Sequence, residues 1–392
     1  IKNTFVNSLV SLVLALVIKL VGYYFAEVIL TGNWIAPFGS MPGNIAQVGF
    51  AIVVALLVAP VLKLATRKVP GSVECTRENV RLERSKEFTN PDIDPKFFDF
   101  YKETCDLLSK AMHTDTKAFI LGGEGILGLE AACASLTEEG DRVIVIDNGI
   151  FGKGFADFVS MYGGEPVLFS SDYRNPVNID ELRDFLSKDS NFKYATVVHC
   201  DTPSGVMNDV ESISKLFDEF GILTVCDSVA GMFGEPLDLS NSKIDILCGG
   251  SQKALSAPPG LTMVWVSDRA FEAMQNRKTP IKAFYANLLF IKDYYENQWF
   301  PYTMPASDIM GLRVAIDNYL EDADFQNRHK QLARATRNAV EKAGLKLYLE
   351  SGYSNNVTVI EIPEGITEDE ILSRLRDEFG ILISGCFDVL KG

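Results

Sequence analysis

The chain has 392 residues, of which 47% are apolar and 23% charged, so it is long and apolar enough to bury one large core or two modest ones. Its formal net charge of −15 is unevenly distributed. Residues 1–70 carry five basic side chains and one acidic one, whereas residues 71–392 carry 32 basic and 51 acidic ones. The acidic part argues against nucleic acid as a partner, because phosphate binding needs a basic stripe on the surface.

The cysteines and histidines point to no metal site. The seven cysteines are scattered, include no C-x-x-C pair and mostly lie within or beside apolar runs, which indicates free thiols in a reducing compartment. The three histidines, His113, His199 and His329, show no metal-ligand spacing, and we expect structural roles for them.

Two long apolar runs occupy the first seventy residues. Residues 5–30 are almost wholly apolar, broken by Lys19 and Glu27, and a second run covers residues 45–62. Each can cross a bilayer, which takes about 20 apolar residues. The first run is too long, and too charged in its second half, for a secretory signal. Three basic residues follow the second run, so both ends are expected to face the cytoplasm. The sequence predicts a membrane segment, residues 1–69, with two transmembrane helices.

The string from Val21 to Gln47 resembles the C-terminal part of the S component of an energy-coupling-factor vitamin transporter. The resemblance covers about the last third of such a component. It implies that membrane contact runs through residues 5–62. Because the chain opens with isoleucine inside an apolar stretch, we expect it to be a piece of a longer reading frame, with the residues after the second run tethered on the cytoplasmic side. An artefact that joins two adjacent genes is the alternative, and those later residues would then form a cytoplasmic protein. The polar positions expected to contact the vitamin are Glu27, Asn33, Trp34, Asn44 and Gln47.

The composition changes after Pro70-Gly71, where a short polar linker marks a domain boundary. Strand-like runs then recur at residues 118–123, 142–147, 165–169, 194–200, 222–227, 244–249 and 261–266. Segments with helical period separate most of them, at residues 126–136, 155–162, 179–186 and 210–220. This alternation predicts an α/β fold with a seven-stranded, mostly parallel sheet, whose ligands bind at the carboxyl ends of the strands.

The pattern changes again near Asp308. It predicts helices over residues 308–319, 325–343 and 368–378, and a strand pair around residues 346–349 and 357–362. We therefore expect a large domain over residues 70–305 and a smaller α+β domain over residues 306–392.

The most specific motif is S-Q-K-A-L-S-A-P-P-G-L, residues 251–261, which directly follows an apolar strand. Its Lys253 lies at a strand end beside a proline-braced turn, where partial burial would favour a neutral, nucleophilic amine. Asp227 ends another strand. An aspartate that faces the protonated nitrogen of a pyridine ring keeps that ring an electron sink. A lysine and an aspartate on neighbouring strand ends suit pyridoxal 5′-phosphate (PLP).

On these motifs, residues 75–392 resemble the class V, fold-type I PLP-dependent aminotransferases, most closely the alanine–glyoxylate and serine–glyoxylate group. The resemblance implies that Lys253 binds the cofactor and carries the proton between the substrate and the cofactor. It also implies that Asp227 pairs with the ring nitrogen and that Phe151, in D-N-G-I-F-G-K-G, stacks on the ring. Thr202 and Ser204, in D-T-P-S-G, would lie near the 3′-oxygen of the ring.

The string L-G-G-E-G-I-L-G places glycines before a helical run, as a phosphate site requires. The resemblance implies that Gly123, Glu124 and Gly125 form the phosphate-binding turn, although Glu124 replaces the usual Ser or Thr. Because a carboxylate repels a phosphate, we expect Glu124 to turn away, toward a cation or the substrate pocket. Ser251 and Gln252 are expected to supply further donors.

Thr303, in F-P-Y-T-M-P, matches a family position that reaches the phosphate of the neighbouring subunit, which implies a homodimer with shared active sites. Two departures from the family stand out. Its early Pro-Gly-Pro loop is not recognisable between Val69 and Lys86, and the chain stops at Gly392, before the segment whose arginine binds the substrate carboxylate.

The expected function is transfer of an amino group from alanine or serine to glyoxylate or pyruvate. A cysteine desulfurase is the nearest alternative, but those enzymes have His directly before the lysine, where this chain has Gln252. Their reactive cysteine lies on a late loop, whereas Cys386 lies in an apolar run. From a different class, the chain could be a vitamin-uptake subunit with the enzyme as a fused passenger.

Overall fold

The computed structural model describes residue 34 and residues 76–386. These residues belong to two compact units, and the larger one includes residues 76–370 and 384–386. The two predicted transmembrane helices and four of the predicted vitamin contacts lie outside the described residues, while Trp34 is described on its own. Within the described ranges, no helix is long and apolar enough to cross a bilayer.

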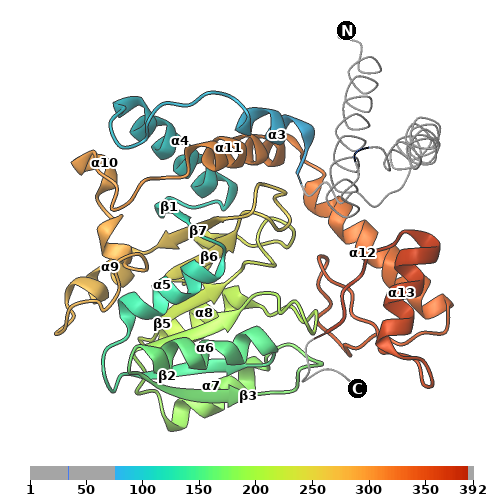
Figure 1. Cartoon of the computed structure of the whole chain (residues 1–392). Coiled ribbons are helices and arrows are strands. Elements are labelled where there is room, and N and C mark those ends of the chain that lie inside the picture. The colour runs from blue at the N-terminus through green and yellow to red at the C-terminus, as the bar shows by residue number, and fades with distance from the viewer. Residues whose placement is uncertain (1–33, 35–75, 387–392) are drawn as a thin grey trace. The chain divides into compact units, whose positions relative to one another are not determined.

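The larger unit is built on one seven-stranded sheet with the order β1-β7-β6-β5-β4-β2-β3 (Figure 1). Strand β7 is antiparallel to both its neighbours, β1 and β6, and the other neighbours pair in parallel. The predicted seven-stranded, mostly parallel sheet is therefore confirmed. The strands are β1 (Ala118–Gly122), β2 (Arg142–Asp147), β3 (Glu165–Ser170), β4 (Tyr194–Val198), β5 (Leu223–Asp227), β6 (Ile246–Gly250) and β7 (Leu261–Val266).

Helices cover the sheet because its central strands are apolar on both faces. Every residue of β4, β5, β6 and β7 is buried, as expected for parallel strands between two helical layers. Figure 1 shows α5, α6 and α8 against the sheet. The helices of the larger unit are α3 (Glu78–Arg84), α4 (Pro95–Ala111), α5 (Ile126–Leu136), α6 (Ile150–Met161), α7 (Ile179–Lys188), α8 (Val210–Glu219), α9 (Asp268–Gln275), α10 (Tyr294–Asn297), α11 (Ala306–Glu321) and α12 (Phe325–Lys342), with short 3₁₀ turns at Leu239–Asn241 and Leu288–Phe290.

Helix α4, which the sequence pattern did not predict, covers the open edge of the sheet at β1. Asp94 caps its first turn by accepting a hydrogen bond from the Lys96 amide, and Pro95 occupies the first helical position. The buried hydroxyl of Tyr101 donates to the carbonyl of Ile120 in β1 and accepts from its amide, both at 2.7 Å. This side chain therefore satisfies backbone groups that an edge strand would otherwise leave open to another chain.

The C-terminal segment differs from the prediction at the strand pair. Segments 346–349 and 357–362 form one isolated bridge, between Leu347 and Ile360, rather than two strands. Two backbone hydrogen bonds hold this bridge, from the Tyr348 amide to the Val359 carbonyl at 3.0 Å and from the Glu361 amide to the Lys346 carbonyl at 2.9 Å. Just beyond it, the Glu350 amide donates to the carbonyl of Arg174 at 3.0 Å, so the pairing does not extend into a ladder. Helix α13 (Glu368–Phe379) was predicted at nearly its observed bounds. The boundary at residues 305–306 stays a prediction.

The sheet brings the motif residues to one edge. Strand β1 is parallel to β6, so the carboxyl ends of β1, β2, β4, β5 and β6 meet there, and β7 begins at the same edge because its Leu261 pairs with Gly122 of β1. The loops that follow these strand ends build the candidate site.

Candidate active site

The lysine loop, residues 251–260, joins β6 to β7 at this edge. Fully buried Ser251 holds the loop together: its hydroxyl donates to the Pro258 carbonyl at 2.5 Å and its carbonyl accepts from the Ala257 amide at 3.0 Å. Lys253 lies on the loop and is exposed, so the expectation of partial burial is wrong, because the loop stands out at the edge of the sheet. The role of Ser251 as a phosphate donor stays a prediction, and its hydroxyl is engaged inside the loop.

Asp227 ends β5 and is 5% exposed. Burial and the neighbouring Asp201 carboxylate together raise the pKa of its carboxyl to about 7, although the Val229 amide and the charge of Lys253 act to lower it. One carboxylate oxygen accepts from the Val229 amide at 2.8 Å, and among the described residues the other has no hydrogen-bond donor. A protonated pyridine nitrogen would give this buried carboxylate the positively charged donor that it lacks. The residues therefore fit the ring of the cofactor.

The turn at residues 123–125 is fixed to the lysine loop and to β7. The Gly123 amide donates to the Gly260 carbonyl at 2.8 Å, and the Thr262 hydroxyl lies 3.0 Å from the carbonyl of Gly123 and 2.7 Å from that of Glu124. A Cβ at Gly125 would lie 2.7 Å from a methyl carbon of Val229, so the close approach requires glycine. The amides of Glu124 and Gly125 donate to no acceptor among the described residues, and they precede the start of α5, where an anion is favoured.

Glu124 was expected to turn toward a cation or the substrate pocket, and in the structure its carboxylate is bound by two amide donors. Its carboxylate accepts from the Ile126 amide at 3.0 Å and from the side-chain nitrogen of Gln252 at 2.5 Å. The side-chain oxygen of Gln252 is buried and has no hydrogen-bond partner among the described residues. The turn and the lysine loop therefore place two acceptor groups, the Glu124 carboxylate and the buried amide oxygen of Gln252, near the amides of Glu124 and Gly125.

Phe151 and the D-T-P-S-G turn meet at Asp201, a residue to which the sequence analysis assigned no role. Asp201 is fully buried, and its carboxylate accepts from the Phe151 amide at 2.8 Å and from the Ser204 hydroxyl at 3.1 Å. The Phe151 side chain is 37% exposed. Thr202 is half-buried next to Asp201. The aspartate at the start of D-T-P-S-G was the available signal, but its partner in α6 is 50 residues away in sequence.

His199 ties the ends of β4 and β5 together. Its amide donates to the Asp227 carbonyl at 2.7 Å, and its ring Nδ1 lies 2.9 Å from the Ser228 hydroxyl. Burial lowers the pKa of the imidazole to about 4, so the ring is neutral near neutral pH. Val229, which holds Asp227 and packs on Gly125, is a second residue that the sequence analysis missed, because no sequence signal marks a side chain that packs on a distant glycine.

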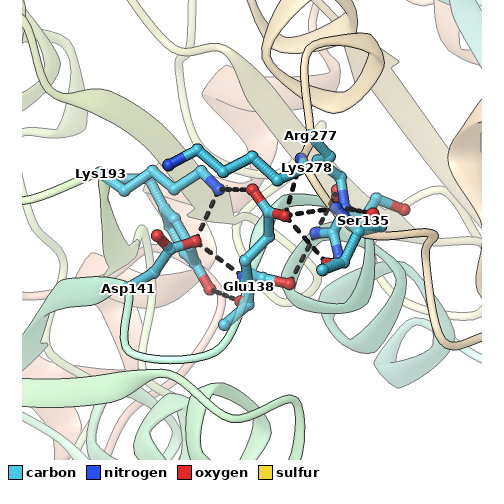
Figure 2. Close-up of polar contacts among 9 residues, drawn as sticks. Ser135, Glu138, Asp141, Lys193, Arg277 and Lys278 are labelled. Atoms are coloured by element: carbon cyan, nitrogen blue, oxygen red, sulfur yellow. Dashed lines mark hydrogen bonds and ion pairs between the residues drawn. The ribbon is translucent and has the colours of Figure 1, made fainter.

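The far end of α5 is held by a polar network, shown in Figure 2. The Arg277 guanidinium donates to the carbonyls of Ser135 and Thr137 at 3.1 and 2.6 Å. Glu138 accepts from the Lys278 amide at 2.9 Å and forms an ion pair with Lys193 at 3.3 Å. A cation at the C-terminus of a helix is favourable, and this network fixes the helix whose other end borders the site.

Thr303 is not joined to the turn at 123–125 by any hydrogen bond among the described residues. Its hydroxyl donates to the Asp92 carboxylate at 2.8 Å. Its neighbour Tyr302 stacks on Tyr285, with ring centroids 3.9 Å apart. The predicted contact with a neighbouring subunit stays a prediction.

Comparisons with known proteins agree with this geometry. The family model described as aminotransferase class-V matches residues 115–385. The chain is 34% identical over 302 residues to pyridoxamine–pyruvate transaminase of Mesorhizobium japonicum, which covers 75% of this chain and 76% of that protein. It is 29% identical over 323 residues to serine–glyoxylate aminotransferase of Arabidopsis thaliana, covering 80% of each.

The fold is also similar to the crystal structure of alanine–glyoxylate aminotransferase from Nostoc sp., with a TM-score of 0.77, 26% sequence identity, and coverage of 81% of this chain and 85% of that one. The family match extends over more than half of the chain, from β1 to the C-terminal segment, and includes the lysine loop, Asp227 and the turn at 123–125. The chain therefore belongs to the class V aminotransferases, a family of enzymes that depend on pyridoxal 5′-phosphate.

Proposed function

We propose that this enzyme transfers an amino group from a small amino acid, alanine or serine, to a small 2-oxo acid, glyoxylate or pyruvate. The placement of Lys253 beside buried Asp227, at the edge where α5 begins, carries the proposal. The relatives named for alanine, serine, glyoxylate and pyruvate support these substrates.

Each residue at this edge has a distinct task in such a reaction. When bound, the cofactor supplies an electron sink for the carbanion at the substrate α-carbon. Asp227 holds the proton on the ring nitrogen, because its buried charge gains a partner there. The Lys253 amine would hold the cofactor and would move the proton at the substrate α-carbon. Phe151 would lie against the ring and limit its movement.

Single-turnover absorbance tests this function. The chain is loaded with PLP and mixed with alanine, serine or aspartate, and the keto product is measured after acid quench. We expect a long-wavelength absorbance band that alanine or serine bleaches and that Lys253→Ala lacks, with Lys188→Ala, at the exposed end of α7, as the control. An unchanged band in Lys253→Ala contradicts the assignment.

A second candidate donor is pyridoxamine, the B6 form without phosphate, with pyruvate as the acceptor. Glu124 and the buried oxygen of Gln252 favour it, because two acceptors at the turn suit a hydroxymethyl group, which donates a hydrogen bond, better than a phosphate, which only accepts. A carboxylate also repels a phosphate dianion. The relative named pyridoxamine–pyruvate transaminase supports the same donor.

Affinities for the two B6 forms separate these candidates. If pyridoxamine is the donor, pyridoxal binds the chain more tightly than PLP, and Glu124→Ser reverses the order. Glu124→Gln is the matched control, because it removes the charge and keeps the size of the side chain. If the unchanged chain binds PLP more tightly than pyridoxal, pyridoxamine is excluded as the donor, and alanine or serine remains the proposed donor.

We also propose a homodimer in which Thr303 serves the site of the partner. Large aromatic side chains near Thr303 are exposed in the single chain, which supports burial of this surface against a second copy. Phe284 is 59% exposed, Tyr285 47% and Trp299 51%. Mixing Lys253→Ala with Thr303→Ala chains tests sharing, since a mixed dimer keeps one intact site and recovers activity that neither variant has alone. Two inactive variants that stay inactive after mixing contradict the sharing.

The alternatives from other classes have less support. Cys386 is half-buried, its sulfur lies 3.3 Å from the Pro203 carbonyl, and burial raises the pKa of its thiol, whereas a desulfurase needs a reactive thiolate. A vitamin-uptake role and the membrane tether depend on residues outside the described part of the chain and stay predictions. Uptake of labelled pyridoxal by vesicles that contain this chain tests both.

A further inference from the structure

The start of helix α6 lacks a cap of its own. Its first residues follow Gly149, which packs closely against Asp201. A Cβ at Gly149 would lie 2.3 Å from the Asp201 carboxyl carbon, so there is no room for a side chain at this position. The Asp201 carboxylate reaches across from the end of β4 and accepts from the amides of Phe151 and Gly152. A negative charge at the start of a helix is favourable, and hydrogen bonds from amides to a carboxylate are the strong kind.

The same carboxylate also fixes the turn that follows β4. The Ser204 hydroxyl donates to its other oxygen at 3.1 Å and the Ser204 amide at 3.3 Å. Asp201 is fully buried and forms no ion pair among the described residues, so backbone amides and one hydroxyl are its partners. The Asp201 side chain thus fixes the distance between Phe151 and the Thr202–Ser204 turn. It lies near Asp227, because its charge raises the pKa of the Asp227 carboxyl.

We propose that Asp201 is a positioning residue that fixes Phe151 for stacking on the B6 ring. This inference rests on the proposed binding of that ring at Asp227. Asp201 binds the amides at the start of α6, and its role is to fix the position of Phe151 rather than to contact the ring. The Phe151 side chain is partly exposed at the edge of the sheet. A ring held by Asp227 alone could still tilt about that contact, whereas a stacked Phe151 limits the tilt.

A double-mutant cycle tests the inference. Affinity for pyridoxal and for PLP, and the circular dichroism of the bound ring, are measured for the unchanged chain, Asp201→Asn, Phe151→Leu and the double variant. We expect Asp201→Asn to weaken binding about two- to tenfold, the range of an aromatic stack, and to weaken the dichroism. In the Phe151→Leu background, Asp201→Asn should have no further effect on either.

Two further variants separate positioning from general loss of structure. Asp147→Asn is the matched control: it changes another buried aspartate at a strand end, whose partners are the Ser170 and Tyr173 hydroxyls, and it should leave the affinity for the ring unchanged. In Gly149→Ala the added methyl group would clash with the Asp201 carboxyl group and displace it, so this variant should repeat the effect of Asp201→Asn. If one of the two variants does not fold, the other still tests the inference.

The outcomes are distinct. The positioning role is overturned if Asp201→Asn weakens ring binding equally in the unchanged chain and in Phe151→Leu. It is also overturned if Asp147→Asn weakens ring binding as much as Asp201→Asn does. In both cases the proposed function stands. Failure of the unchanged chain to bind either B6 form overturns both.

Discussion

The carboxylate of Glu124 and the side-chain amide of Gln252 are joined by a 2.5 Å hydrogen bond across 128 residues of sequence. Because the carboxylate only accepts, Gln252 gives it the amide nitrogen, and the amide oxygen is left buried without a partner. The bond ties the turn before α5 to the lysine loop, so the two halves of the site hold each other in place.

Removing that bond should loosen the site without unfolding it. We expect Gln252→Ala to lower the free energy of unfolding by about 1.5–3 kcal/mol, as for a hydrogen bond to a charged group. Urea titration at fixed pH measures the change, and Gln275→Ala, at the exposed end of α9, is the control. A loss no larger than that of the control would show that the bond does not hold the loop.

Gly125 should tolerate no methyl group. A Cβ there lies 2.7 and 2.9 Å from the two methyl carbons of Val229, whose amide holds Asp227. We expect Gly125→Ala to destabilise the chain by about 1–3 kcal/mol, as overpacking does, and to weaken binding of the B6 ring. Gly154→Ala is the matched control in α6: nothing lies within 4 Å of its added Cβ, so we expect it to stabilise the chain by about 0.5–1 kcal/mol. Thermal unfolding and ring titration measure both, and equal stabilities would count against the clash.

The stability of the ligand-free chain should fall as Asp227 ionises. Burial raises the pKa of this carboxyl to about 7, above its ordinary value of 3.8, so the folded chain binds the proton more tightly than the unfolded chain. Stability is therefore lost between about pH 4 and pH 7. We expect Asp227→Asn, which cannot ionise, to be the more stable by on the order of 4 kcal/mol at about pH 8, to match the unchanged chain at about pH 4, and to lose transamination.

Urea titrations of both chains without ligand check this sign. A difference between them that is the same at acid and alkaline pH would mean that ionisation of Asp227 is not its cause.

Glu138 should show the opposite dependence on pH. Burial would raise the pKa of its carboxyl, but hydrogen bonds from Thr279 and the Lys193 ammonium outweigh it and lower the pKa to about 2. The ionised form therefore stabilises the fold above its ordinary pKa, and this contribution is lost as pH falls from about 5 toward 2. Glu138→Gln should be less stable at neutral pH, and the gap should close in acid. The control is Glu139→Gln, which makes the same change at the neighbouring, exposed residue.

The sequence allowed the sheet and the residues at its edge to be predicted, because buried parallel strands are apolar on both faces and their ends carry the polar motifs. Strands β2 and β7 and helix α5 have their predicted bounds. Helix α4 was missed, and the predicted strand pair at residues 346–349 and 357–362 is reduced to one bridge, because the chain just beyond it bonds to Arg174 instead.

The tasks of Asp201 and Val229 could not be predicted for the same reason. Asp201 acts on an amide 50 residues away, and Val229 fits against a glycine more than 100 residues away. Local pattern shows where a residue lies in an element, but packing between distant elements decides what it contacts. Lys253 was expected to be partly buried but is exposed, because a sequence pattern does not show how far a loop extends from the sheet.

The antiparallel strand β7 sets the order in which the enzyme can assemble as it is synthesised. Strand β1 emerges first from the ribosome, yet its partner in the sheet is β7, which ends at Val266. Until then β1 has no strand beside it, and the closure of so long a loop delays pairing. The B6 site is therefore completed late in translation, and a chain that stops before Val266 presents an open edge at β6 and an unpaired β1 to chaperones or to other nascent chains.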